Sequence, residues 1–191
     1  MATSADIETA LVNAVAALLY PQAGVTFAEN VTVARGWPTE ADIRTAMGKQ
    51  TNLIGIYAVA GMTKEVPCAL RYWQEVSHGV AAMEVGRIEQ GFRLDLWACT
   101  PDIRDALLTW LIPALKFQTR YAMPDGSTAT LLRLQATGPD DRPSRADEWA
   151  QSLELTIQYP VIYTQTQPVV TEITQATRLN DGLTMTTQTP T

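Results

Sequence analysis

Residues 85–116 read VGRIEQGFRLDLWACTPDIRDALLTWLIPALK, and this stretch decides the fold. Between residues 87 and 97, apolar side chains alternate with charged or polar ones, which is the period of a β-strand with one buried face. The residues expected on the buried face are Ile88, Phe92, Leu94 and Leu96. The alternation slips at Gln90 and Gly91, so we expect a bulge at Gly91.

A helix is predicted directly after this strand. Thr100 can cap its first turn, Pro101 suits the first helical position, and Asp102 lies at the positive end of the helix dipole. Five apolar residues follow at helical spacing: Ile103, Leu107, Leu108, Leu111 and Leu115. We therefore expect a buried helix over residues 101–115.

The rest of the chain shows the same two periods. Further helices are predicted at 4–19 and, after the cap Thr39, from residue 40 to about 48; strands are predicted at 30–35, 53–60, 70–76, 129–137 and 149–166, and the central strand starts near residue 81. Residues 61–67 and 121–127 are predicted as a loop and a turn, and residues 77–79 as a hairpin turn. Because Pro160 cannot donate to a ladder, it should occupy an edge position or a bulge.

These elements predict an α+β fold. Residues 1–166 should form one domain, with a mostly antiparallel sheet flanked by two main helices at 4–19 and 101–115. Residues 167–191 are rich in Thr and Gln and form an extended C-terminal arm. The arm is too poor in apolar residues to build a core, so it should order only against the sheet edge of a neighbouring subunit or another protein.

Composition excludes several classes of protein. The 191 residues carry a net charge of -6, which argues against a protein that grips phosphates or a basic membrane surface. The N-terminus lacks the basic start of a signal peptide, and no stretch has the ~20 apolar residues of a membrane span, so we expect a cytoplasmic protein. Cys68 and Cys99 are expected to be reduced thiols.

No motif in the sequence indicates a particular catalytic reaction. His78 is the one histidine, and a turn residue is the simplest interpretation of it. A Cys–His pair with Cys68 or Cys99 is the remote alternative. The acid pairs at 140–141 and 147–148 could bind a divalent ion weakly, although a solvated loop is the simpler interpretation of them. We therefore expect no catalytic, metal-binding or cofactor-binding residues, and no enzymatic activity.

Five tryptophans divide into two groups. Trp73, Trp97 and Trp110 lie within predicted strands or the helix and should be core. Trp37 and Trp149 lie at element boundaries, where an aromatic side chain is either a lid on the core or an interface anchor. The candidate subunit-interface residues are Trp37 and Trp149 with three residues of the arm, Val169, Val170 and Ile173.

Residues 35–38, RGWP, stand between a short strand and a capped helix, and the first helix ends in LYP at 19–21. In this motif and in the order of its elements over 4–166, the chain resembles tail-completion and neck proteins of long-tailed bacteriophages, and its layout is similar to the tail terminator family. That resemblance implies a non-enzymatic subunit of a hexameric ring on the tail tube. It would assemble in the host cytoplasm, remain in the tail or neck of the virion, and contact the tail tube protein and the neck or head-completion proteins.

The acidic charge fits this expectation, because a lumen lined by carboxylates would let DNA pass without binding it. Two alternatives stay open. One is another virion connector or a tail tube subunit, although tube proteins have long hairpins and fewer helices. The other is a small cytosolic ligand-binding or enzyme module that uses the groove between the helices and the sheet.

Overall fold

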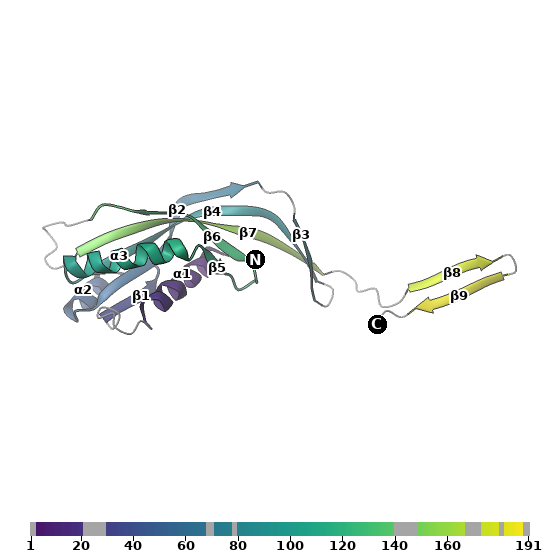
Figure 1. The fold of residues 1–191 in the computed structure, drawn as a ribbon, viewed down its shortest axis with the longest axis horizontal. Coiled ribbons are helices and arrows are strands. Elements are labelled where there is room, and N and C mark those ends of the chain that lie inside the picture. The colour runs from purple at the N-terminus through teal and green to yellow at the C-terminus, as the bar shows by residue number, and fades with distance from the viewer. Residues whose placement is uncertain are drawn as a thin grey trace.

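The computed structural model describes residues 3–20, 30–67, 71–77, 80–139, 149–166, 173–179 and 182–188 (Figure 1). Its helices are α1 (Ser4–Leu19), α2 (Glu40–Gly48) and α3 (Pro101–Phe117). Its strands are β1 (Val31–Arg35), β2 (Asn52–Val66), β3 (Arg71–Ser77), β4 (Val80–Ala98), β5 (Arg120–Ala122), β6 (Thr128–Ala136), β7 (Trp149–Thr166), β8 (Ile173–Leu179) and β9 (Gly182–Gln188).

Seven of the strands form one sheet, in the order β1-β2-β4-β7-β6-β5, with β3 paired to β4 beyond the end of β2. The β1–β2 pair is parallel and the other pairs are antiparallel. Strands β8 and β9 form a separate two-stranded sheet. The predicted α+β class, with a mostly antiparallel sheet and flanking helices, is confirmed.

The β4–β7 pair is the longest ladder of the sheet. It runs from Val80 opposite Thr166 to Ala98 opposite Trp149, with one register shift near Val85. Figure 1 shows the two strands reaching beyond the helices toward β3. Strand β6 leaves β7 at Gln158, so the last part of β7 has β4 on one side alone among the described strands.

The predicted helix starts are confirmed by their caps. The Thr39 hydroxyl accepts a hydrogen bond from the Asp42 backbone N–H at 3.2 Å, and the Asp42 carboxylate accepts one from the Thr39 N–H at 2.9 Å. This reciprocal box satisfies donors that have no partner inside the helix. α1 begins with the same arrangement. At the start of α3, the Thr100 hydroxyl accepts from the Ile103 N–H at 3.2 Å.

The core lies between α1, α3 and one face of the sheet. The largest fully buried side chains are Ile7, Leu11, Leu19, Ile54, Ile56, Phe92, Leu94, Leu96, Leu107, Leu111, Leu115 and Leu153. The apolar stripe predicted for α3 is therefore buried, except that Ile103 is only half-buried. Removal of this apolar surface from water is the main term that holds the helices on the sheet.

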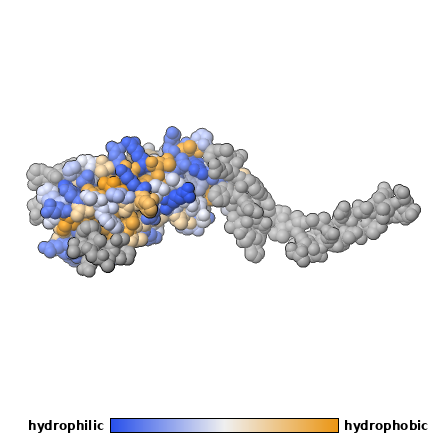
Figure 2. All heavy atoms as spheres, viewed as in Figure 1, coloured by the Kyte–Doolittle hydropathy of each residue, from blue (hydrophilic) through white to orange (hydrophobic). Residues whose placement is uncertain are grey.

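Of the described helices, α2 is the one that lies on the opposite face of the sheet, at one end. There Ile43 of α2 packs with Leu53 of β2 and Trp97 of β4 in a small second cluster. We call this face the open face. Figure 2 shows apolar residues interspersed with hydrophilic ones on the side of the molecule in view.

One local prediction is wrong. Residues 61–66 belong to β2 rather than to a loop, since Lys64 pairs with Glu89. These residues are mostly exposed, so they lack the apolar alternation by which a half-buried strand is recognised. The irregularity expected at Gly91 is present in the β2–β4 pair, where the register shifts between Ala58 and Thr63, and the extra residues lie on β2; the β4–β7 ladder passes Gly91 without a shift.

Other predictions are altered or lie outside the described residues. The predicted turn at 121–127 begins within β5, and the turn proper covers 123–127. Pro160 lies beyond the end of the β6 ladder, which confirms its predicted edge position. Residues 78–79, which belong to the predicted hairpin turn, lie outside the residues that the structure describes. Residues 167–191 were predicted as an extended arm, and the β8–β9 hairpin within it was not predicted.

Candidate functional site

The RGWP segment lies flat against β2 and carries Trp37 onto the open face. Gly36 has a φ of 88°, a conformation that glycine adopts without strain, and its N–H donates to the Ile56 carbonyl at 2.7 Å. A Cβ added to Gly55 would lie 2.7 Å from Cδ of Pro38. The absence of a side chain at Gly55 therefore lets the segment approach the strand.

Trp37 is the centre of an aromatic cluster. Its ring centroid lies 4.9 Å from that of Tyr57 and 6.2 Å from that of Trp97, at interplanar angles of 65° and 81°. Both are edge-to-face contacts, the arrangement that aromatic quadrupoles favour. Trp37 nevertheless remains 60% exposed, whereas Trp97 is 5% exposed. The cluster thus fixes the orientation of an indole that is still accessible.

Next to this cluster lies a chain of polar contacts around Asp95. The Arg93 Nε donates to Asp95 Oδ1 at 2.7 Å, and its Nη2 donates to the Ser152 hydroxyl at 2.7 Å. The Tyr57 hydroxyl donates to Asp95 Oδ2 at 2.8 Å. Asp95 is only 4% exposed, so these donors compensate its burial. Burial and the hydrogen bond to Asp95 raise the pKa of Tyr57, which keeps the hydroxyl neutral.

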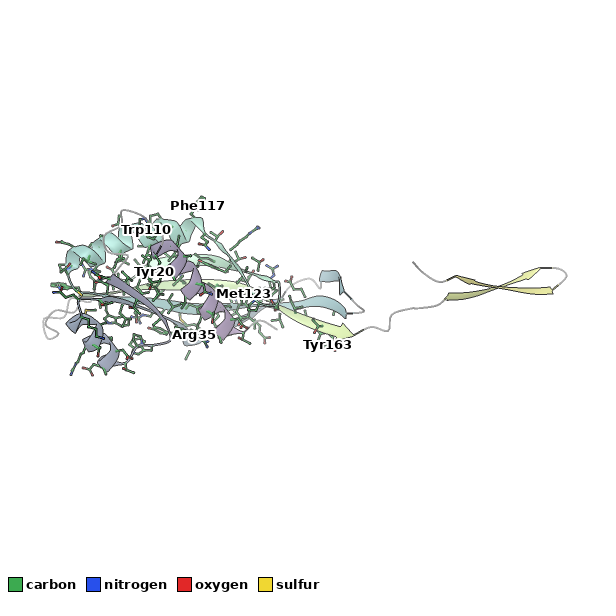
Figure 3. The ribbon with its side chains drawn as sticks, turned by 90° about the horizontal axis from the view of Figure 1, so that it is seen from below. Tyr20, Arg35, Trp110, Phe117, Met123 and Tyr163 are labelled. Atoms are coloured by element: carbon green, nitrogen blue, oxygen red, sulfur yellow. The ribbon has the colours of Figure 1, made fainter. Side chains whose placement is uncertain are left out.

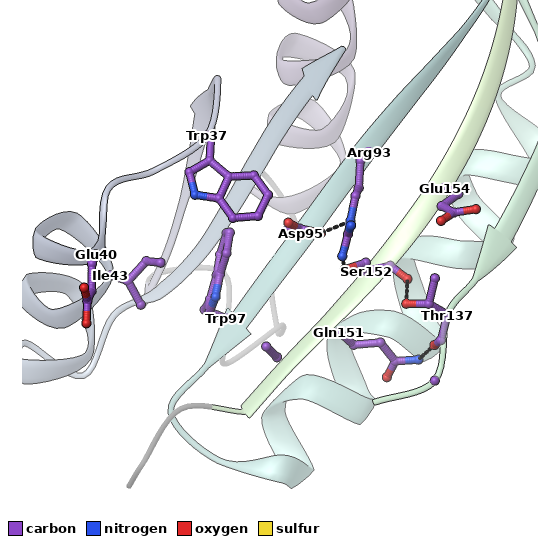
Figure 4. Close-up of a pocket in the computed structure, with 12 residues that line it drawn as sticks. Trp37, Glu40, Ile43, Arg93, Asp95, Trp97, Thr137, Gln151, Ser152 and Glu154 are labelled. Carbon is purple, nitrogen blue, oxygen red and sulfur yellow. Dashed lines mark hydrogen bonds and ion pairs between the residues drawn. The ribbon is translucent and has the colours of Figure 1, made fainter. Parts of the chain in front are cut away.

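A pocket of about 300 Å³ lies between the aromatic cluster and β7 (Figure 4). Its lining residues are Trp37, Glu40, Ile43, Arg93, Asp95, Trp97, Thr137, Gly138, Ala150, Gln151, Ser152 and Glu154. Arg93 is the one cation among three acids, and two of its nitrogens are already hydrogen-bonded. The pocket therefore offers aromatic edges and carboxylates rather than a free positive charge.

The described residues contain no arrangement for nucleophilic or metal catalysis. No group of three His, Cys, Asp or Glu side chains in the described part of the chain could hold a metal ion. Cys99 is a free, half-buried thiol, and burial raises its pKa. A nucleophilic cysteine needs the opposite shift, because the thiolate is the reactive form. His78 lies outside the described residues.

The structure separates the two tryptophans predicted as interface residues. Trp37 is on the open face. Trp149 is half-buried at the start of β7, opposite Ala98, whose burial places the pair on the helix-covered face. Ile173 begins β8, whereas Val169 and Val170 lie outside the described residues. Of the predicted core tryptophans, Trp97 is buried and Trp110 is half-buried against the core; the side chain of Trp73 is not described.

Sequence reasoning missed how the open face is assembled. The alternation in β4 places Arg93 and Asp95 on the polar side of the strand, but nothing indicated their partners. Tyr57 and Ser152 are distant in sequence and belong to β2 and β7. Their proximity follows from the strand order, which the sequence does not specify.

Neither the known family models nor the curated protein sequences contain a match to this chain. Within the described residues, none of the helices combines the length and the apolar character that a membrane crossing needs.

Proposed function

We propose that this chain is a structural assembly protein, a subunit of a ring at the head-proximal end of a bacteriophage tail. In this role it ends the tail tube and joins it to the head or neck. The proposal is supported by the resemblance over residues 4–166 and by the absence of a catalytic arrangement among the described residues. An exposed indole held rigidly at Trp37 also suits a protein contact.

The observation that carries the proposal is the edge of β7 that no described strand covers beyond Gln158. Strand β7 continues to Thr166, whereas its ladder with β6 ends at Gln158. A run of backbone donors and acceptors of this length is a surface on which another strand can pair. It is a surface for a polypeptide, and it offers little to a small metabolite.

The ring is expected to be a hexamer that contacts the tail tube protein and the neck or head-completion proteins. A net charge of -6 supports a lumen through which DNA passes without specific binding. The protein would assemble in the host cytoplasm and remain in the tail or neck of the virion. It would act without a cofactor and without catalytic residues.

Electron microscopy of the purified protein and of the particle that contains it tests this proposal. We expect rings in the purified sample and the same ring at the head-proximal end of the tail. A position along the tube, or at another junction, would assign the chain to the rival virion roles. A protein that sediments as a monomer at all concentrations and is absent from particles would overturn the proposal.

The pocket beside Trp37 favours a second candidate, a small ligand-binding module. Its aromatic edges could hold a flat apolar ligand, and its acids could hold a cationic group. Titration of the full chain with aromatic amines, monitored by tryptophan fluorescence, tests this candidate. Saturable quenching that disappears in Trp37→Ala, in a protein that stays monomeric, would favour the second candidate over the first.

A further inference from the structure

The outer edge of β1 is closed by a side chain of the same molecule. The Tyr20 hydroxyl donates to the Val31 carbonyl at 2.8 Å and accepts from the Val33 N–H at 3.3 Å. These two backbone groups are the ones that a further strand would need. Figure 3 shows Tyr20 and Arg35 in this region of the molecule, away from Tyr163 on β7.

The neighbouring edge of β2 is closed in the same way. Glu8 of α1 accepts from the Ala58 N–H at 2.8 Å through Oε1, and its Oε2 accepts from Arg35 Nε at 2.9 Å. The Glu8 side chain is only 14% exposed. Blocking exposed strand edges is how proteins prevent unwanted pairing, and α1 performs this role for β1 and β2.

Among the described residues, the edge of β7 from residue 160 to residue 166 has no strand beside it. The β6 ladder ends at Gln158, and β4 pairs with the other side of β7. Tyr163 is 51% exposed, and Thr164 is exposed beside it. Pro160 removes a single donor at the start of the segment and leaves the remainder free.

Among the described strands, β8 and β9 pair with each other alone, so the two outer edges of their hairpin have no described partner. Its strands are seven residues each, a length comparable to the free part of β7, and they pair with each other and not with the seven-stranded sheet. Their sequences, ITQATRL and GLTMTTQ, hold few bulky apolar residues. A two-stranded hairpin alone is at best marginally stable in water, so this one needs a partner.

We propose that the free edge of β7 binds the β8–β9 hairpin of a second copy of this chain. The added hairpin would extend the sheet by two strands and join the copies through backbone hydrogen bonds. This inference rests on the proposed function in one respect, because a ring requires identical copies to be joined. It identifies the two surfaces that meet and leaves the position of the ring in the virion to the particle experiment.

Photo-crosslinking between isotope-labelled and unlabelled chains tests the proposal. Tyr163 is replaced by benzoylphenylalanine in the full chain, and this protein is mixed with ¹⁵N-labelled wild type and irradiated. Mass spectrometry should then find crosslinks from position 163 to peptides of residues 173–188 that carry the other isotope. Crosslinks confined to the same isotope would mean that the hairpin folds back on its own strand. Those crosslinks, crosslinks between two copies of position 163, or none at all would overturn the proposal.

Leu132 provides the matched control. It is 50% exposed, close to the value for Tyr163, and it lies at a register shift in β6. The photo-crosslinker at position 132 should not reach residues 173–188. Tyr163→Lys should weaken self-association at least ten-fold in sedimentation, since a charge on an edge strand opposes pairing, whereas Leu132→Lys should leave it unchanged. Circular dichroism verifies that both variants fold.

The two proposals can fail separately. Crosslinks between copies in a protein that is absent from phage tails would refute the proposed function and keep the edge pairing. Rings at the head-proximal end of the tail, without crosslinks to residues 173–188, would refute the edge pairing and keep the function.

Discussion

The two faces of the seven-stranded sheet use opposite means of holding neighbouring elements. The helix-covered face mainly packs apolar residues of α1 and α3 against Phe92, Leu94 and Leu96. The open face instead holds Asp95 at 4% exposure by two donors, Arg93 Nε and the Tyr57 hydroxyl, and Arg93 is itself held by Ser152. Apolar burial scales with area, whereas a polar network depends on every member. We therefore expect the helix-covered face to determine most of the free energy of unfolding, and the open face to determine the shape of the surface around Asp95.

The largest effect should come from the helix-covered face. Leu111→Ala should lower the free energy of unfolding by about 2–5 kcal/mol, because Leu111 is fully buried and its truncation leaves a cavity. Thr109→Ala on the exposed side of α3 is the control and should stay within about 0.5 kcal/mol. Denaturant unfolding measures both. Similar values for the two variants would mean that α3 does not pack on the core.

On the open face, Asp95→Ala should cost about 1.5–3 kcal/mol, because it removes charged hydrogen bonds and leaves the Arg93 guanidinium and the Tyr57 hydroxyl without their acceptor. Glu154→Gln, at an exposed position of the same pocket, should cost at most about 1 kcal/mol. Equal losses of unfolding free energy in the two variants would show that the hydrogen bonds of Asp95 contribute no more than a surface ion pair.

A third comparison concerns the close approach of the RGWP segment to β2. Gly55→Ala should destabilise by about 1–3 kcal/mol, because the new Cβ would overlap Pro38, and it should also change the fluorescence of Trp37. Gly86→Ala is the control, since a Cβ there meets nothing within 4 Å. If both substitutions were neutral in denaturant unfolding, the segment would not lie against the strand.

The smallest effects concern two buried hydroxyls on the helix-covered side. The Tyr121 hydroxyl has no hydrogen-bond partner among the described residues, whereas the Tyr159 hydroxyl donates to Gln90 at 3.1 Å. At neutral pH, Tyr121→Phe should be neutral or stabilising by up to about 1 kcal/mol, and Tyr159→Phe should be destabilising by about 1 kcal/mol. A clear loss of stability in Tyr121→Phe, measured by thermal or denaturant unfolding, would indicate a partner for that hydroxyl.

Tyr121→Phe should also change how the stability of the protein depends on pH in alkaline solution. Burial raises the pKa of Tyr121 to about 12, above the value of about 10 in an unfolded chain. The unfolded state therefore loses this proton first, and the contribution of Tyr121 to stability is complete below about pH 10 and falls as the pH rises toward about 12. Between about pH 9 and about pH 11, wild type should lose more stability than Tyr121→Phe. If wild type and Tyr121→Phe lost the same amount of stability over this pH range, the burial of the Tyr121 hydroxyl would be contradicted.

Whether a feature could be predicted from the sequence depends on whether the interactions behind it are local or join residues that are distant in sequence. The three helices were predicted because the caps Thr39 and Thr100 and the apolar stripes are local signals. The end of β2 was missed because its exposed residues lack an apolar period. The Asp95 network was missed because it joins three strands, and the β8–β9 hairpin because Thr-rich segments carry little apolar alternation. The motif that the resemblance depends on, RGWP, does place Trp37 on the surface, but its pairing with Tyr57 required the structure.

The difference between the closed β1 edge and the free β7 edge also restricts how copies of the molecule can assemble. Tyr20 and Glu8 close one side of the sheet, and the two surfaces that would pair, the β7 edge and the hairpin, are different, so copies can add head to tail. Such contacts are heterologous: they close into a ring when the rotation per copy divides a full turn, and they form a helical filament when it does not. The geometry with which the hairpin of one copy pairs with β7 of the next would set that rotation. A change in this geometry should therefore alter the number of copies per assembly, or convert rings into filaments, before it weakens the contact itself.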